Sequence, residues 1–271
     1  MPVIRLINGC EGAALDPLDR GAQYGDGVFR TLRVARERPQ WLEAQLAKLG
    51  DDAARLGIDA PDTAAWRADL AKLDGRLSGG VLKLLLTRGI GARGYRPPSG
   101  VTPTRIVIHD STPPPSDQWP ATGLNLRVCE FRLAEQTRLA GIKHLNRLEN
   151  VLARAEWDDP EIHEGLLRDA SGRVISGVMS NLLLWRNGRL LTPRLDRCGV
   201  AGVTRARLMR HATAAGFAVE ESELGLDEVM AADELMLCNS LIGLRRVARL
   251  GARAWPDTEI YDVLHTLLDA E

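Results

Sequence analysis

The sequence has no excess of charge of either sign. Its 35 Lys and Arg residues nearly balance its 36 Asp and Glu residues, so the formal net charge at pH 7 is −1. No run of like charge suggests a tail, and no basic surplus would attract the phosphates of a nucleic acid. We therefore expect no nucleic-acid partner, although single arginines can still bind an acidic small molecule.

Cysteine and histidine are scarce and scattered. The five histidines form no H-E-x-x-H pattern and the cysteines have no C-x-x-C spacing, so no metal site is expected. The thiols are expected to be reduced and mostly buried, as in a cytoplasmic protein. The N-terminus passes directly into a strand-like run and no apolar stretch reaches membrane-spanning length, so we expect neither a signal peptide nor a membrane partner. The four cysteines are Cys10, Cys129, Cys198 and Cys238.

A chain of 271 residues can form one large domain or two small ones, and its 45% hydrophobic content can supply a core. The strongest boundary signal is the segment 111–120, Ser-Thr-Pro-Pro-Pro-Ser-Asp-Gln-Trp-Pro, because proline removes backbone donors and disfavours helices. We predict an interdomain connector there, between a smaller N-terminal α/β domain over 1–110 and a larger domain over 121–271. The alternative is a surface loop within one domain.

The coarse pattern of elements is that of an α+β chain, because short strands and helices occur without strict β-α alternation. An apolar stripe at steps of three and four predicts a helix over 41–56. Asn-Gly pairs at 8–9 and 187–188 predict turns between strands. Further helices are expected over 62–73, 146–157, 204–215 and 257–268, and strands over 3–7, 28–35, 81–87, 105–109, 124–129, 164–168, 182–185 and 235–238.

The most informative segment is 139–150, Leu-Ala-Gly-Ile-Lys-His-Leu-Asn-Arg-Leu-Glu-Asn, which places Lys143 after a glycine-containing turn. A lysine just ahead of a helix can point into a cleft, where its deprotonated amine is a nucleophile toward carbonyl compounds. Most lysines are solvated surface groups, so the residue type alone assigns no role. Apolar residues at helical spacing predict that the helix begins near Asn146: they are Leu145, Leu148, Val151 and Leu152.

This segment closely resembles the cofactor-lysine motif of the class IV aminotransferase superfamily, the fold-type-IV pyridoxal-phosphate enzymes. Within that superfamily, Gly-Ile-Lys-His-Leu-Asn-Arg-Leu-Glu is most similar to the motif of aminodeoxychorismate lyases. Four further segments extend the resemblance over most of the chain, and their order and spacing make it specific. They are 19–29 (Asp-Arg-Gly-Ala-Gln-Tyr-Gly-Asp-Gly-Val-Phe), 87–95, 199–205 and 237–241.

The resemblance implies two α/β domains with the fold of D-amino-acid aminotransferase, pyridoxal 5'-phosphate in the cleft between them, and a homodimer. It also implies that Lys143 belongs to the larger domain, bonds the cofactor covalently and moves the substrate α-proton when it is free. Such a base works best with a pKa near neutrality, which burial and the neighbouring cations His144 and Arg147 would favour.

The phosphate of the cofactor needs several donors. Gly202, Val203 and Thr204 precede an apolar-periodic segment, so their amides are expected at a helix N-terminus, which is an anion site. Thr204 can add its hydroxyl or can be an ordinary N-cap, and the resemblance favours the phosphate. Asn239 and Ser240 follow a strand and are candidates for a second phosphate-side turn, or equally for a plain polar turn.

Two positions depart from the family pattern. Relatives carry an arginine that grips the phosphate on the helix over 41–56, where this chain has Lys48. Lysine keeps the charge but loses the two-pronged donor, so Lys48 is either a point-charge ligand or a surface lysine. Relatives also place a glutamate against the pyridine nitrogen, where this chain has Ser176. A neutral serine cannot keep that nitrogen protonated and so favours elimination over transamination, unless Ser176 is only a strand residue.

The substrate of the lyases that the chain resembles, aminodeoxychorismate, carries two carboxylates, and arginine binds a carboxylate with two parallel hydrogen bonds. Arg30 and Arg93 are the candidates, and either can instead be a surface ion pair. Tyr95 can pack against the ring or donate its hydroxyl. The glycines around Arg93 are typical of a mobile lid, whereas Asp26, between two glycines, is interpreted as a turn former.

We therefore predict a pyridoxal-phosphate lyase that converts 4-amino-4-deoxychorismate to 4-aminobenzoate and pyruvate, a step of folate biosynthesis. Two alternatives stay open. One is a D-amino-acid or branched-chain aminotransferase, because the lysine motifs are similar. The other is a non-catalytic protein that binds pyridoxal phosphate, suggested by the departures at Lys48 and Ser176.

Overall fold

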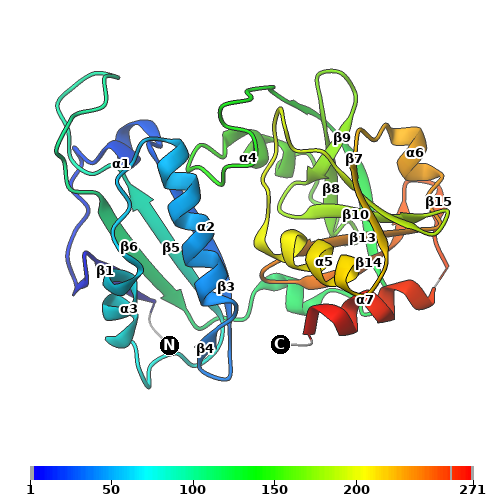
Figure 1. Cartoon of the computed structure of the whole chain (residues 1–271), viewed down its shortest axis with the longest axis horizontal. Helices are drawn as coiled ribbons and strands as arrows, with labels where there is room; N and C mark the ends of the chain where they lie inside the picture. Colours follow the sequence, from blue (N-terminus) through cyan, green and yellow to red (C-terminus); the bar gives the residue numbers. More distant parts are fainter. Residues whose placement is uncertain (1–2, 257, 270–271) are drawn as a thin grey trace. The chain divides into compact units, whose positions relative to one another are not determined.

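The computed structural model describes residues 3–256 and 258–269, which fold into two compact units (Figure 1). The first unit extends to Pro114 and also includes Lys143–Asn146. The second unit consists of Pro115–Ile142 and the chain from Arg147 onward.

The grouping of Lys143–Asn146 with the first unit differs from the prediction, which put Lys143 in the larger C-terminal domain. Backbone hydrogen bonds explain the difference. Phe29 N donates to the Lys143 carbonyl and Leu145 N donates to the Gly27 carbonyl, each at 2.9 Å. The segment thus extends the edge of a first-unit strand, although the chain on both sides of it belongs to the second unit.

The proline-rich segment contains a short 3-10 helix, η1 (Pro115–Gln118), where the sequence predicts no regular structure. Proline is tolerated at the first position of a helical turn, because its missing N–H would have no partner there. The three consecutive prolines therefore end where a helical turn begins.

The first unit is built on a six-stranded antiparallel sheet in the order β2-β1-β6-β5-β3-β4. Helix α2 packs against β3 and α3 against β6 (Figure 1). The predicted Asn8-Gly9 turn joins β1 to β2, and both residues have positive φ, at 47° and 77°. The elements are β1 (Ile4–Ile7), β2 (Cys10–Glu11), α1 (Arg20–Tyr24), β3 (Gly27–Ala35), β4 (Arg38–Pro39), α2 (Leu42–Arg55), α3 (Thr63–Ala71), β5 (Val81–Thr87) and β6 (Thr104–Asp110).

Helix α2 confirms the helix predicted over 41–56. Its buried face carries Leu46, Leu49 and Ala53, as the apolar spacing requires. The same face also buries two polar residues, Gln45 and Asp52. A carboxylate on the apolar face of a helix needs partners, because a buried charge is costly unless it is paired.

The second unit is built on a nine-stranded mixed sheet in the order β12-β11-β10-β13-β14-β7-β8-β9, with β15 paired to β14. The sheet curls, so that its last strand β9 also contacts β10 and β11. The elements are β7 (Leu124–Leu133), α4 (Leu148–Arg154), β8 (Glu164–Asp169), β9 (Val174–Gly177), β10 (Asn181–Arg186), β11 (Arg189–Pro193), α5 (Val203–Ala214), β12 (Ala218–Ser222), α6 (Leu226–Met230), β13 (Glu234–Asn239), β14 (Gly243–Leu250), β15 (Arg253–Ala254) and α7 (Glu259–Asp269).

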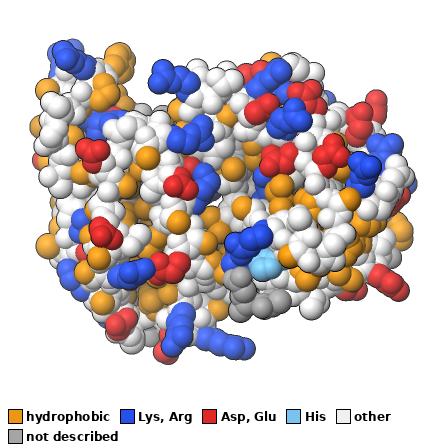
Figure 2. Space-filling view, viewed as in Figure 1, with side chains coloured by type: hydrophobic (Ala, Val, Ile, Leu, Met, Phe, Trp, Pro, Cys, Tyr) orange, Lys and Arg blue, Asp and Glu red, His pale blue; other side chains and the backbone are white. Residues whose placement is uncertain are grey.

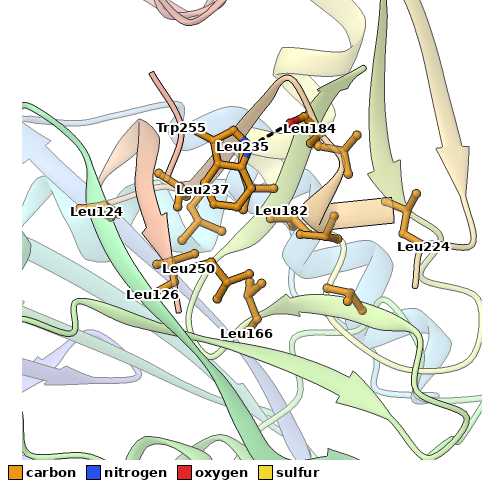
Figure 3. Close-up of a cluster of buried hydrophobic side chains, with 14 of the residues drawn as sticks. Leu124, Leu126, Leu166, Leu182, Leu184, Leu224, Leu235, Leu237, Leu250 and Trp255 are labelled. Atoms are coloured by element: carbon orange, nitrogen blue, oxygen red, sulfur yellow. Dashed lines mark hydrogen bonds between the residues drawn. The ribbon is translucent and has the colours of Figure 1, made fainter. Parts of the chain in front are cut away.

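A leucine-rich core fills the curled sheet (Figure 3). Leu182 and Leu184 of β10 meet Leu235 and Leu237 of β13, and all four side chains are fully buried. Trp255 closes this core and donates its indole N–H to the Ala232 carbonyl at 2.9 Å. Burial of each such side chain contributes about 1.5–3 kcal/mol, so this core is a main source of stability in the second unit.

Helix α4 is shorter than predicted, and its apolar stripe does not face the core. Leu148, Val151 and Leu152 are 75%, 60% and 56% exposed, whereas Ala153 is fully buried. Asn150, on the inner side, donates to the Val178 carbonyl at 2.7 Å. The helical periodicity was real, but it marked an exposed face, which a sequence pattern cannot distinguish from a core face.

Charged side chains of both signs are interspersed over the face shown in Figure 2. Among the described residues, no helix combines the length and apolar character needed to span a bilayer.

Candidate active site

The predicted site residues are found in both units, and each group has a clear local setting. Lys143, Lys48, Arg30, Arg93 and Tyr95 are in the first unit, and Ser176, Gly202, Val203, Thr204, Asn239 and Ser240 are in the second.

Lys143 has its backbone fixed on both sides. Its N–H donates to Asp52 Oδ2 at 3.0 Å, and its carbonyl accepts from Phe29 N at 2.9 Å. The next residue, His144, forms a bridge with Val28 at the start of β3. The Lys143 Nζ lies 4.6 Å from the centroid of the Phe29 ring. The lysine amine therefore extends from a backbone that β3 and α2 hold in place.

Asp52 is the residue that brings Lys143, Lys48 and Arg30 together. Its side chain is fully buried and forms ion pairs with both Arg30 and Lys48, in addition to its bond with Lys143 N. The Lys48 side chain is 24% exposed. Asp52 is not among the site residues predicted from the sequence, although an acid one helical turn after Lys48, on the apolar face of α2, was a usable signal.

Arg30 lies inside this cluster, at 2% exposure. Its Nη2 donates to the Lys48 carbonyl at 3.1 Å and to Asp52. Burial lowers the pKa of the Arg30 guanidinium, and the charge of Asp52 opposes that shift. Arg30 thus forms a buried ion pair. The sequence suggested a substrate contact or a surface ion pair, and the buried pair is a third possibility.

Arg93 and Tyr95 lie in the loop 88–103 between β5 and β6, and both are exposed, Tyr95 at 86%. Arg20 of α1 anchors this loop by donating to the carbonyls of Gly94 and Tyr95, at 2.9 and 3.3 Å. Tyr24 accepts from Gly94 N at 3.2 Å, and its ring meets that of Tyr95 edge-on. The glycine-rich loop is therefore attached at its centre to α1.

Asp26 forms ion pairs with two arginines that hold this loop, whereas the sequence predicted only a turn former. Its carboxylate pairs with Arg20 and Arg88, each at 2.8 Å from Nε. Burial alone would raise the pKa of Asp26, but the hydrogen bonds from Arg88 and Arg20 outweigh burial, so the pKa lies below its ordinary value. Asp26 is thus an ion-pair centre at the base of the loop.

The N-terminus of α5 has the features of an anion site. Gly202 is the N-cap, and no side chain caps the helix. Thr204 is 1% exposed, and among the described residues its Oγ1 has no hydrogen-bond partner. Buried hydroxyls are rarely left unpaired, so this orphan calls for an external partner. The amides of a helix's first turn and its dipole both favour an anion there.

Asn181, at the start of β10, holds the turn that precedes α5. Its Oδ1 accepts from Gly202 N at 3.1 Å, and its Nδ2 donates to the Val200 carbonyl at 2.7 Å. A Cβ added to Gly202 would collide with Asn181 Oδ1, so the turn requires glycine at 202. Asn181 is not among the site residues predicted from the sequence.

The second predicted turn uses its asparagine internally. Asn239 Oδ1 accepts from Leu241 N at 2.8 Å and from Ile242 N at 3.0 Å, and Nδ2 donates to the Met179 carbonyl at 3.0 Å. These bonds hold the turn together through Asn239, and they tie it to residue 179. Ser240 follows directly in the same turn.

Ser176 lies in β9 and is 7% exposed. It pairs with Leu167 of β8, whereas Gly177 pairs with Leu166. Successive strand residues point to opposite faces of a sheet. A Cβ on Gly177 would lie 3.0 Å from Glu164 Oε2, so the Glu164 carboxylate is on the Gly177 face. Glu164 therefore does not replace the carboxylate that the family resemblance places at position 176.

The chain just before Lys143 is tied to the turn that leads into α5. Gly141 N donates to the Gly199 carbonyl at 2.9 Å, and Ala201 N donates to the Gly141 carbonyl at 3.1 Å. These three residues all belong to the second unit. The turn that leads into α5 is thus bonded to the residue two positions before Lys143 in the sequence.

Comparisons with known proteins identify the family. The family model for amino-transferase class IV matches residues 27–250. The chain belongs to the class IV aminotransferase family. This class IV chain is 45% identical to 4-amino-4-deoxychorismate lyase from Pseudomonas aeruginosa, whose crystal structure matches it with a TM-score of 0.92 over 98% of each chain.

Two curated relatives extend the comparison. Aminodeoxychorismate lyase from Vibrio harveyi is 34% identical over 251 residues, which are 91% of each protein. D-alanine aminotransferase from Bacillus licheniformis is 27% identical over 234 residues, which are 84% of this chain and 80% of the relative. The family recognised from the segment around Lys143, and the two-domain fold-type-IV architecture that it implies, are confirmed.

Proposed function

We propose that the protein is a pyridoxal-phosphate lyase that converts 4-amino-4-deoxychorismate to 4-aminobenzoate and pyruvate, in the supply of 4-aminobenzoate for folate biosynthesis. The observation that carries this proposal is the 45% identity to the lyase from Pseudomonas aeruginosa over 98% of both chains. The lyase from Vibrio harveyi is also nearer in sequence than the aminotransferase from Bacillus licheniformis, at 34% against 27% identity.

Lys143 is proposed as the residue that bonds the cofactor and moves the substrate proton. When bound, pyridoxal phosphate supplies an aldehyde for covalent attachment and a ring that withdraws electrons from the substrate carbon. The Lys143 Nζ, when it is not bonded, takes the proton from the amine-bearing carbon. The bonds of its backbone to Asp52 and Phe29 support this proposal, because they leave only the side chain to move.

The first turn of α5 is proposed as the phosphate site. The unpartnered Thr204 hydroxyl and the uncapped helix N-terminus suit a phosphate, which can accept from both. Gly202 and Val203 are proposed to bind the phosphate through their backbone. Asn239 and Ser240 are proposed as a second turn on the phosphate side. Lys48 and Arg30 both form ion pairs with the Asp52 carboxylate. Because Lys48 is held in this ion pair, it is proposed to act on the phosphate as a point charge at most.

Ser176 is proposed to face the pyridine nitrogen, and its neutral side chain favours elimination. A carboxylate there would keep the nitrogen protonated and strengthen the ring as an electron acceptor. The Glu164 carboxylate on the neighbouring strand lies on the opposite sheet face from Ser176. A lyase whose product becomes aromatic depends less on that electron acceptor than an aminotransferase does.

Arg93 and Tyr95 are proposed as the contacts to the substrate carboxylates. Both are exposed on a loop that Arg20 and Tyr24 hold in one place. Arg30, predicted from the sequence as a substrate contact, is proposed instead as a support of the backbone around Lys143, because its guanidinium is buried in an ion pair with Asp52.

A homodimer is proposed, with the exposed face of α4 in the contact. Leu148, Val151 and Leu152 lie on one face at steps of three and four and are each more than half exposed. Contiguous exposed apolar side chains mark interaction surfaces. The cytoplasm is proposed as the compartment, because four free thiols are kept reduced there.

The deciding experiment supplies the purified protein, loaded with pyridoxal phosphate, with 4-amino-4-deoxychorismate. We expect equimolar 4-aminobenzoate, followed by its fluorescence, and pyruvate, followed by a coupled lactate dehydrogenase assay. Lys143→Ala should abolish both products and the absorbance of the covalently bound cofactor. Lys83→Ala is the matched control, because Lys83 Nζ lies 4.9 Å from the same Phe29 ring and should be dispensable.

The same preparation tests the two alternatives. Rapid amino transfer from a D- or branched-chain amino acid to a keto acid, without 4-aminobenzoate, would replace the lyase by an aminotransferase. Cofactor absorbance without either reaction would indicate a non-catalytic pyridoxal-phosphate-binding protein.

A further inference from the structure

Glu164, the first residue of β8, is a fully buried carboxylate whose hydrogen-bond donors are all uncharged. Oε1 accepts from Gly165 N and Val178 N, each at 3.1 Å. Oε2 accepts from Met179 N at 3.2 Å and from Ser180 Oγ at 3.0 Å. Three backbone amides and one hydroxyl therefore surround the carboxylate.

Burying a carboxylate in this way costs folding free energy. Burial raises the pKa of Glu164, and the hydrogen bonds from Gly165, Met179, Ser180 and Val178 counteract this only in part. An apolar or amide side chain would avoid the desolvation of a charge. What a carboxylate uniquely offers is four acceptor positions, enough to hold three consecutive residues, 178–180, around one point.

The turn 178–180 is connected to both proposed phosphate-side turns. The Met179 carbonyl accepts from Asn239 Nδ2 at 3.0 Å, which ties it to the turn at 239–240. Asn181, which follows Ser180 directly, bonds Gly202 N and the Val200 carbonyl, which ties it to the start of α5. Every contact in this chain of bonds lies within the second unit.

We infer that Glu164 is a positioning residue for cofactor binding: its carboxylate fixes the turn 178–180, and that turn sets the two loops that receive the phosphate. The inference rests on the proposed function, because it takes Thr204 and residues 239–240 as the phosphate side. Glu164 itself touches neither cofactor nor substrate.

Glu164→Gln is the informative substitution, because it preserves shape and removes acceptors. The amide oxygen can still accept from Gly165 N and Val178 N, and the amide nitrogen can donate to Ser180 Oγ. The nitrogen then faces Met179 N–H, and two donors cannot bond each other. Met179 is the residue whose carbonyl holds Asn239, so the disturbance falls on the link to the second turn.

The experiment compares the affinity of each variant for pyridoxal 5'-phosphate and for pyridoxal, which lacks the phosphate, by titrating the absorbance of the covalently bound cofactor. For Glu164→Gln we expect the dissociation constant for pyridoxal phosphate to rise about tenfold, and that for pyridoxal to stay within about twofold. Inorganic phosphate should compete with pyridoxal phosphate less well in this variant than in the wild type.

Glu234→Gln is the matched control. Glu234 is another buried glutamate of the second unit, and burial also raises its pKa, but it accepts from the Thr258 hydroxyl and pairs with Arg246, and among the described residues it has no bond to the turn 178–180. This variant should lose stability without changing the ratio of the two affinities. Ser180→Ala removes one of the four donors and should change the ratio about threefold, and it decides the matter if Glu164→Gln does not fold.

An unchanged ratio of the two affinities in both Glu164→Gln and Ser180→Ala would overturn the inference, because a purely structural role would lower both affinities together or neither. Failure of the proposed function has different signatures: the wild type would show no absorbance of bound cofactor, or would bind the cofactor without forming 4-aminobenzoate.

Discussion

The buried carboxylate of Asp52 accepts a hydrogen bond from the backbone N–H of Lys143, with 3.0 Å between Oδ2 and N. The same carboxylate pairs with Arg30 and Lys48. One acid on α2 thus serves the backbone of the proposed catalytic lysine and two cations from different elements.

Asp52→Asn should lower the free energy of unfolding by about 3–5 kcal/mol, because it leaves the buried Arg30 guanidinium without its counter-charge. Urea unfolding followed by circular dichroism measures this. Asp51→Asn is the control, since Asp51 is the exposed neighbour on α2 and its substitution should cost less than about 0.5 kcal/mol. Equal stability of the two variants would contradict the role given to Asp52.

Thr204→Val should have opposite effects on stability and on cofactor binding. Without cofactor, the variant should be more stable by about 1 kcal/mol, because a buried hydroxyl without a partner is removed. Its affinity for pyridoxal phosphate should fall about tenfold, because that hydroxyl is proposed to bond the phosphate. Thermal melts with and without cofactor measure both effects.

Thr192→Val is the control for this prediction. The Thr192 hydroxyl is also fully buried, but it donates to the Leu182 carbonyl at 2.7 Å and accepts from Arg205 Nε at 3.0 Å. Its removal should destabilise the protein in both states. If Thr204→Val behaved in the same way, its hydroxyl would be satisfied inside the protein and the phosphate assignment would fail.

Arg20→Ala should loosen the loop 88–103, because it removes the donors to the carbonyls of Gly94 and Tyr95. Amide hydrogen exchange at Gly94 should become at least about tenfold faster, which corresponds to about 1.4 kcal/mol of local opening. Arg96→Ala, an exposed substitution in the same loop, should leave the exchange unchanged. Unchanged exchange in Arg20→Ala would show that the loop is held by other contacts.

The ion pairs of Asp26 should make stability depend on pH. The pKa of Asp26 is lower in the folded chain than its ordinary value of 3.8. Its contribution is therefore complete above about pH 5 and is lost as the pH falls through the lower, folded value. The difference in unfolding free energy between wild type and Asp26→Asn should be about 2–3 kcal/mol at pH 7 and should shrink below pH 4. A difference that stayed constant from pH 7 to pH 3 would remove Asp26 from the acid response.

Val151→Glu should weaken self-association, because it places a charge on the exposed apolar face of α4. Sedimentation velocity should show a dimer for the wild type and a dissociation constant at least about tenfold higher for the variant. Val263→Glu on α7 is the control, since Val263 is also exposed, at 42%, on a helix of the same unit. Dimerisation that survives Val151→Glu would place the contact elsewhere.

Local signals predicted well where a single element decides its own structure. The helix α2 followed its apolar stripe, and the hairpin turn at Asn187-Gly188 forms with positive φ at both residues. Strand β14 was missed for a physical reason. Its buried residues Leu244, Val247 and Leu250 recur every three positions, because a register shift next to Val247 breaks the alternation expected of a strand.

Local sequence signals had the same limit in the candidate site. Residues within characteristic motifs, such as Lys143 and Thr204, could be proposed from the sequence. Asp52 and Glu164 were not, and Asp26 was interpreted only as a turn former, because the significance of these acids lies in partners up to 91 positions away, as in the Asp52–Lys143 bond. A buried acid has no sequence signature of its own, since the sequence shows its type but not its donors.

The cysteines differ in burial, so their reactivity can report on unfolding of the chain. Cys129, Cys198 and Cys238 lie in the interior, and burial raises the pKa of each thiol to about 12, so they are poor nucleophiles. Cys10 on β2 is exposed. A maleimide should therefore attach one dye per folded chain and four per denatured chain, so that labelling stoichiometry counts unfolded molecules directly.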